Sequence, residues 1–147
     1  MMKSKALPLA ALFLAVGLGC RPKGTPDQVI HDTLSKTVQA IEAGKVGDAI
    51  DVLDDRYQGP EGMNKAATRF FLVQVLKQGK VGVTILDQDI GVNGEDAFEK
   101  IHVVLTQQGA GLLPDGSKKT YILHWTKRGS DWRIVDIQDF TERPESN

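Results

Sequence analysis

The region from residue 96 to residue 140 is the part of the sequence that most constrains the fold. Three runs there, 96–107, 117–127 and 132–140, are rich in β-branched and aromatic residues. Two turn-forming sequences separate them, Pro114-Asp115-Gly116 and Arg128-Gly129-Ser130-Asp131. Because alternating runs joined by such turns pair as hairpins, they predict an antiparallel meander. The upstream chain is then expected to cover one face of that meander.

A fourth strand is predicted directly before the meander, over residues 80–92. Apolar residues alternate from Val81 to Ile85, but Ile90 has the opposite parity without an intervening turn residue. A switch of parity inside a strand predicts a bulge or bend, here near residues 87–89. Asn93-Gly94 is a strong signal for the hairpin that follows.

Three helices are predicted before these strands. The first begins at the N-cap Thr25, which Gln28 completes as a capping box, and it ends near Gly44. The second is expected over residues 48–57, with Asp48 as its cap. The third, residues 65–78, follows a possible cap at Asn64. Helices followed by antiparallel strands predict an α+β fold with a four-stranded sheet.

The register of the last hairpin can be estimated from its turn. If Lys127 faces Trp132, the pairs on one face are Trp125–Ile134, Leu123–Asp136 and Tyr121–Gln138, and those on the other are His124–Val135 and Ile122–Ile137. Both faces are then partly apolar. The helices can cover one of them, so the other needs sheet curvature, a partner subunit or a bound ligand.

The 147 residues carry a net charge of −1, and 41% of them are apolar. These values predict one globular domain, without the basic excess of a nucleic-acid binder. The first residues differ from the rest: Lys3 and Lys5 precede an uncharged run over 6–19. As a helix this run would span roughly 21 Å, short of the ~30 Å apolar core of a membrane, so it predicts a signal peptide.

Cys20, the only cysteine of the sequence, directly follows that run in Val16-Gly17-Leu18-Gly19-Cys20. The segment resembles the lipobox of bacterial lipoproteins, although Gly17 and Leu18 depart from the usual Leu and small residue. The resemblance implies acylation of Cys20, for example with palmitate, and cleavage before it. The alternative is signal peptidase I cutting at the same bond, which would leave a secreted protein with a free thiol. By resemblance to enterobacterial lipoproteins, Arg21 in place of Asp after the cysteine implies an outer-membrane protein facing the periplasm.

The expected organisation is therefore a signal peptide over 1–19, a lipidated tether over 20–25, a domain over 26–140 and a C-terminal tail over 141–147. Three passages of the domain carry a second resemblance: Ala40-Ile41-Glu42-Ala43-Gly44-Lys45-Val46-Gly47-Asp48-Ala49-Ile50-Asp51-Val52-Leu53, Val92-Asn93-Gly94-Glu95-Asp96-Ala97 and Arg128-Gly129-Ser130-Asp131-Trp132-Arg133-Ile134. Their order is similar to the nuclear transport factor 2-like (cystatin-like) superfamily. This implies helices packed on a curved sheet as a cone, a fold that carries enzymes, binding modules and assembly subunits alike.

Enzymes of that superfamily place an Asp or His inside the cone, with a Tyr or a protonated acid that stabilises an oxyanion. In the register above, Asp136 and Tyr121 share a face with the two tryptophans, so they are the candidate base and hydrogen-bond donor. His102 is a weaker candidate on the solvent side. The simpler interpretation is that Asp136 lies at a rim, that His124 belongs to the core or an interface, and that His31 is solvated.

No cofactor is predicted, and the sequence offers no usual metal-ligand spacing. Asp87 and Asp89 are too few for a calcium site. The leading hypothesis is a non-catalytic, lipid-anchored envelope protein that binds a small apolar ligand or a protein partner through its cone pocket or sheet face. The partner could be an envelope protein or a second copy, which would need Ile122, His124, Val135 and Ile137 on one patch. The alternatives are a small cofactor-free isomerase or cyclase and a structural subunit of an envelope assembly.

Overall fold

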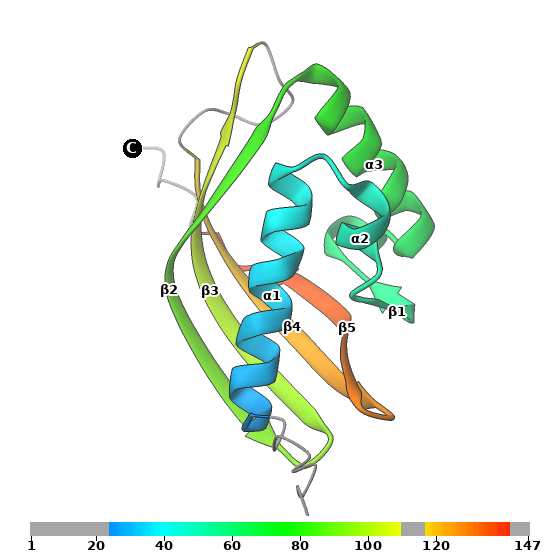
Figure 1. Cartoon of the computed structure of the whole chain (residues 1–147), viewed down its shortest axis with the longest axis vertical. Coiled ribbons are helices and arrows are strands. Elements are labelled where there is room, and N and C mark those ends of the chain that lie inside the picture. The colour runs from blue at the N-terminus through cyan, green and yellow to red at the C-terminus, as the bar shows by residue number, and fades with distance from the viewer. Residues whose placement is uncertain (1–23, 110–116, 142–147) are drawn as a thin grey trace, which may run out of the picture.

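The computed structural model describes residues 24–109 and 117–141, which form helices packed on one curved sheet (Figure 1). The helices are α1 (Pro26–Glu42), α2 (Val46–Ile50) and α3 (Lys65–Gln78), with a 3₁₀ turn, η1, at Pro60–Gly62. The strands are β1 (Leu53–Gln58), β2 (Val81–Asn93), β3 (Asp96–Gln107), β4 (Ser117–Arg128) and β5 (Asp131–Asp139). The predicted α+β class is confirmed.

The sheet has the strand order β1-β5-β4-β3-β2. The strands β2 to β5 form the predicted antiparallel meander, and Gly94 adopts the positive φ of 61° that its hairpin turn requires. The prediction of four strands is wrong, because β1 adds a fifth strand in parallel to the edge of β5. That edge would otherwise present unpaired backbone groups.

The fifth strand replaces the second half of the predicted second helix. α2 ends at Ile50, and Lys45 rather than Asp48 is its N-cap. Leu53 and Tyr57 are four residues apart, a spacing that keeps two side chains on one face of a helix and also of a strand. The edge of β5 decides between these structures, because Leu53 pairs with Ile134 in the parallel ladder.

Predicted caps hold the other two helices. The backbone N–H of Thr25 donates to Oε1 of Gln28 at 3.3 Å, as a capping box requires. Asn64 Oδ1 accepts from the backbone N–H of Ala67 at 2.9 Å at the start of α3. The C-terminal end of α3 is tied to the sheet, because Gln107 Nε2 donates to the carbonyl of Val75 at 2.7 Å.

The core lies between α1 and the concave face of the sheet. Ile30 and Leu34 of α1 point into it, and Trp125 is fully buried on β4. The inward positions of β3 are mostly apolar, with Ala97, Ile101 and Val103 buried. Burying such side chains contributes roughly 1.5–3 kcal/mol each for the larger ones, so this layer is the main source of stability.

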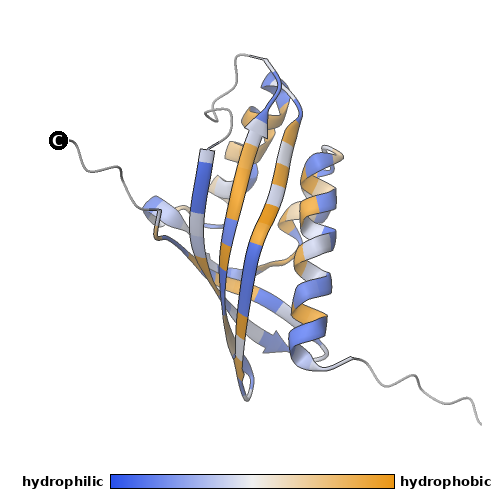
Figure 2. Ribbon diagram, turned by 90° about the vertical axis from the view of Figure 1, so that its left-hand side faces the viewer, coloured by the Kyte–Doolittle hydropathy of each residue, from blue (hydrophilic) through white to orange (hydrophobic). Residues whose placement is uncertain are grey.

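The opposite, convex face of the sheet carries no helix of the described chain (Figure 2). Exposed large apolar side chains occur on it: Phe98 on β3 and Leu86 at a bulge in β2 are 55% and 57% exposed. That bulge falls between Ile85 and Asp87, so the predicted break in β2 is confirmed. Among the described residues, no helix is long and apolar enough to cross a membrane.

Candidate functional site

A bulge in β5 changes the predicted surroundings of Asp136. Trp125 pairs with Ile134, as predicted, but His124 then pairs with Asp136, so one residue of β5 is unmatched. Beyond this point the predicted register is wrong by one residue, and Asp136 faces His124 instead of Leu123. The premise that placed Asp136 beside the tryptophans therefore fails.

The same bulge separates the other residues of the predicted sites. Leu123 pairs with Ile137, which packs against the core, while Ile122 pairs with Gln138. Tyr121 stays partly buried against the core and pairs with Asp139. Burial raises the pKa of Tyr121, and the charge of Asp139 adds to the rise. The patch proposed for a homodimer is divided, because Ile137 lies on the core side.

The interior carries instead an ionisable group that the sequence interpretation missed, Glu99 of β3, which has 0% of its surface exposed. Gln88 Nε2 donates a hydrogen bond to Glu99 Oε1, and Trp125 Nε1 donates to Oε2 at 2.8 Å. We call Gln88, Glu99 and Trp125 the Glu99 cluster. Burial raises the pKa of Glu99, whereas the two donors oppose that rise.

The sequence contained a signal for this cluster. Glu99 occupies the same parity as Ala97, Ile101 and Val103, so it is a charged residue within an otherwise apolar, buried row. Such residues are almost never fully buried unless they are hydrogen-bonded or functional. His31 of α1 lies close enough to favour the charged form of Glu99, although its own side chain is 57% exposed.

The other candidate histidines lie on the sheet with neighbouring polar groups. His102 Nδ1 is 2.9 Å from Thr120 Oγ1, on the facing strand. His124 Nε2 is 3.1 Å from Asp96 Oδ1, and its ring stacks on Phe98 with the ring centroids 4.5 Å apart. His124 does stand opposite Asp136 in the β4–β5 ladder, but the printed contacts of its ring are with Asp96 and Phe98, and those of His102 are with Thr120.

A groove of about 580 Å³ opens beside His102, and we call it the convex groove. Its basic residues are Lys100, Lys118 and Lys119, and its apolar walls include Leu86, Ile122 and Phe140. This volume lies within the range of roughly 300–1,000 Å³ that is usual for small-molecule sites. The groove therefore joins apolar surface with positive charge.

The wall of the convex groove at Phe140 is fixed by backbone contacts. The N–H of Phe140 donates to the carbonyl of Thr120 at 2.8 Å, and the N–H of Thr120 donates to Thr141 Oγ1 at 3.2 Å. Asp139 Oδ1 accepts from the N–H of Thr141 at 2.8 Å. The end of β5 is thus held against β4, and the Phe140 ring, 52% exposed, stays at the groove.

The lysines of the convex groove form no ion pair with any described residue. Asp89 of β2 stands opposite Lys100 in the ladder, and Asp87 stands opposite His102, but neither carboxylate lines the groove. Asp87 accepts instead from the backbone N–H of Gln88 at 2.9 Å. Within the lining of the groove, the lysine charges therefore have no carboxylate partner among the described residues.

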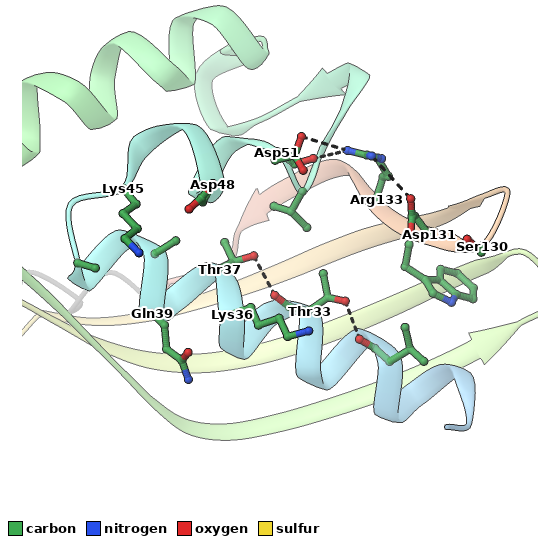
Figure 3. Close-up of a pocket in the computed structure, with 15 residues that line it drawn as sticks. Thr33, Lys36, Thr37, Gln39, Lys45, Asp48, Asp51, Ser130, Asp131 and Arg133 are labelled. Carbon is green, nitrogen blue, oxygen red and sulfur yellow. Dashed lines mark hydrogen bonds and ion pairs between the residues drawn. The ribbon is translucent and has the colours of Figure 1, made fainter. Parts of the chain in front are cut away.

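A second groove, of about 690 Å³, lies between α1, α2 and the β4–β5 hairpin (Figure 3). Its charged lining residues are Lys36, Lys45, Asp48, Asp51, Asp131 and Arg133. Figure 3 shows the Arg133 guanidinium between two carboxylates, 3.8 Å from Asp51 and 3.9 Å from Asp131. Its charges balance and its arginine joins α2 to the hairpin, so this helix–hairpin groove has a structural explanation.

The described residues contain no group of three or more His, Cys, Asp or Glu side chains that could hold a metal ion. Cys20 lies outside the described residues, as do the predicted signal peptide and most of the C-terminal tail. Lipidation therefore stays a prediction from the sequence.

No protein-family model and no curated protein matches the sequence. Solved structures do match the fold. An NTF2-like protein from Cytophaga hutchinsonii superimposes with a TM-score of 0.68 at 15% identity, over 79% of this chain and 98% of that one. A protein of unknown function from Mycobacterium tuberculosis gives 0.71 at 15% identity, over 81% and 73%. A cystatin-like protein of unknown function from Nostoc punctiforme gives 0.63 at 13% identity, over 77% and 88%.

These structures show that the chain has the NTF2-like, cystatin-like fold, as the order of its motifs predicted. At such identities the likeness extends to the fold alone. The function has to be argued from the chain's own side chains.

Proposed function

We propose that the protein is a lipid-anchored domain of the bacterial cell envelope that binds a small ligand with an apolar body in the convex groove and catalyses no reaction. The observation that carries the proposal is that the exposed Leu86 and Phe140 and the half-buried Ile122 line one groove on the sheet. Exposed apolar side chains gathered in a concave site favour ligand binding over a solvated surface.

The alternative of a cofactor-free isomerase or cyclase is favoured by one observation, the raised pKa of the buried Glu99 carboxyl. A catalytic acid or base must come within hydrogen-bond reach of its substrate. Both Glu99 oxygens already accept from protein donors, and Glu99 lines neither the convex groove nor the helix–hairpin groove. In our proposal Glu99 therefore orders the core.

The anchor would attach beside the first turn of α1, because Cys20 precedes Gly24, the first described residue, by four positions. α1 begins at the end of the molecule where β2 and β3 join (Figure 1). The convex groove lies further along the strands, on the side of the domain.

Intact-protein mass spectrometry of membrane-extracted material tests the anchor. Wild type should give the mass of residues 20–147 with added acyl chains, and Cys20→Ser should lose that species. An unmodified wild-type mass would remove the anchor from the proposal while leaving the binding site in place.

The binding site can be tested with the neutral fluorescent probe N-phenyl-1-naphthylamine and full-length Cys20→Ser protein, which cannot be acylated. Adding Phe140→Ala should weaken probe binding, because it removes one apolar wall of the groove. Phe70→Ala on α3 is the matched control, since Phe70 is 68% exposed and lies outside the groove. Equal losses in both variants would contradict the proposed site.

Glu99→Gln separates the binding module from the enzyme. Because Glu99 is buried and does not line the convex groove, its substitution should leave probe binding unchanged. Loss of probe binding in a variant that still unfolds cooperatively would place the ligand against the interior carboxyl and favour the enzyme.

A further inference from the structure

We infer that the convex groove takes an amphiphilic anion, a ligand with a negatively charged head such as a phosphate or carboxylate and an apolar tail. This inference rests on the proposed binding function and specifies its ligand.

The head would be bound by the lysines. Lys100 of β3 and Lys118 of β4 stand on the same convex face, four residue pairs apart along the ladder, with the His102–Thr120 pair midway between them. Lys119, near the start of β4, completes the basic part of the lining. None of these ammonium groups forms an ion pair with a described carboxylate, and an anionic head would supply charge-assisted hydrogen bonds to them.

His102 adds a further polar contact for the head. Its Nδ1 is engaged with Thr120 Oγ1 at 2.9 Å, and this contact fixes the ring at the groove. The other ring nitrogen, Nε2, stays available to a ligand. A fixed ring between two flexible lysines provides orientation, whereas the lysines provide charge.

The tail would be bound by the apolar walls. Ile122 pairs directly with Lys100 across the β3–β4 ladder, so head and tail contacts adjoin one another. Phe140 lies on the side of β5 and Leu86 on the side of β2, and both are more than half exposed. A free anion would leave these walls in water, and a neutral apolar molecule would leave the lysines unpaired. An amphiphilic anion satisfies both surfaces.

The charge pattern distinguishes this groove from the helix–hairpin groove. There, basic and acidic residues occur in equal number and Arg133 bridges two carboxylates. In the convex groove the charged lining residues all have one sign. An anionic ligand is therefore attracted to the convex groove and experiences no net attraction in the other.

The test uses decyl phosphate below its micellar concentration, titrated calorimetrically into the full-length Cys20→Ser protein. Decanol supplies the same tail without the charge, and inorganic phosphate supplies the head alone. Decyl phosphate should bind at least about tenfold more tightly than either, because it engages both surfaces. Lys100→Gln combined with Lys118→Gln should remove most of that advantage and leave decanol binding unchanged.

The paired substitutions Lys36→Gln and Lys45→Gln remove the same charge from the helix–hairpin groove and should have no effect. Phe140→Ala should weaken decyl phosphate and decanol alike. If decyl phosphate bound with the same affinity as decanol and the lysine substitutions did not change it, the inference of an anionic head would be wrong, and the proposed binding function would stand. If neither decyl phosphate nor decanol bound, both the inferred ligand class and the proposed binding function would be wrong.

Two further outcomes concern the source of the anion. Inorganic phosphate that binds as tightly as decyl phosphate would make the groove a plain anion site and overturn the inference. Vesicles of phosphatidylglycerol and of phosphatidylcholine provide the membrane comparison. Binding to phosphatidylglycerol vesicles through the same lysines, without binding of dissolved decyl phosphate, would show a surface contact with lipid headgroups instead of an enclosed ligand.

Discussion

Replacing Glu99 tests how the interior of the sheet is held together. In Glu99→Gln, the introduced amide oxygen can still accept from Trp125 Nε1, and its NH₂ can donate to Gln88 if the Gln88 amide turns its oxygen inward. All buried donors stay paired, so this variant should lie within about 1 kcal/mol of wild type at pH 4. Glu99→Leu leaves the buried Trp125 N–H without an acceptor, which should cost about 1–3 kcal/mol.

The pH dependence gives the sharper result. Burial raises the pKa of Glu99 in the folded protein above its unfolded value of about 4.3. As the pH rises through that value, the unfolded chain releases a proton that the folded chain retains, so wild type loses stability. The loss ends above the folded pKa, and its slope cannot exceed about 1.4 kcal/mol per pH unit for one group.

Glu99→Gln removes this loss. The difference in unfolding free energy between the variant and wild type should therefore grow in favour of the variant from pH 4 towards pH 8. Urea unfolding followed by tryptophan fluorescence at several pH values measures it. Glu95→Gln, an exposed change in the turn before the same strand, is the matched control and should follow the wild-type curve. Parallel pH curves for wild type and Glu99→Gln would refute the reasoning.

Three further predictions concern stability. Arg128 Nε donates to Asp54 Oδ2 at 2.8 Å, and this hydrogen bond lowers the pKa of Asp54. Wild type should therefore lose stability as the pH falls below about 4. Thermal unfolding of Asp54→Asn should not show that loss. Burial raises the pKa of Tyr57 to about 12. The free energy of unfolding of wild type should therefore fall by up to about 3 kcal/mol between pH 10 and 12, and that of Tyr57→Phe should lack this fall. Gly47→Ala, in open space within α2, should stabilise by about 0.5–1 kcal/mol, whereas Gly79→Ala places a Cβ against a backbone carbonyl and should cost more than about 2 kcal/mol.

Each of these has a distinct contrary result. If Asp54→Asn lost as much stability as wild type below about pH 4, the Arg128–Asp54 ion pair would add nothing to the stability of the folded state. Phenol absorbance that titrates completely near pH 10 would contradict the burial of Tyr57. Equal effects of alanine at Gly47 and Gly79 in chemical unfolding would contradict the close approach at Gly79.

The turns and most strands could be predicted because their residues have few alternatives. Asn93-Gly94 permits a tight hairpin, and the parity switch after Ile85 marks the bulge in β2. The bulge in β5 had no such mark, since apolar residues occur there at both parities, with Ile134 and Val135 adjacent. The wrong register beyond Ile134 follows from that ambiguity, and it misplaced Asp136.

Pairing between strands that are distant in the sequence could not be predicted from the local sequence pattern. Leu53 and Tyr57 satisfy a helical and an extended spacing equally, and only the free edge of β5 selects the strand. Glu99 is a different case, because the buried apolar residues of the same parity were a signal for its burial that the sequence interpretation missed, and its partners Gln88 and Trp125 lie on two other strands. Site residues assembled from separate strands require the register before they can be grouped.

The distribution of paired and unpaired polar groups argues for function on the outside of the cone. Inside, the Glu99 carboxylate is bonded on both oxygens, so the core is complete without a ligand. On the convex face, lysines lie beside apolar side chains in a groove that no described carboxylate lines, on a chain of net charge −1. Clustered like charges repel one another and exposed apolar walls are hydrated at a cost. A ligand with an anionic head and an apolar tail reduces both the charge repulsion and the cost of hydrating the walls, and for this reason we place the binding site in the convex groove.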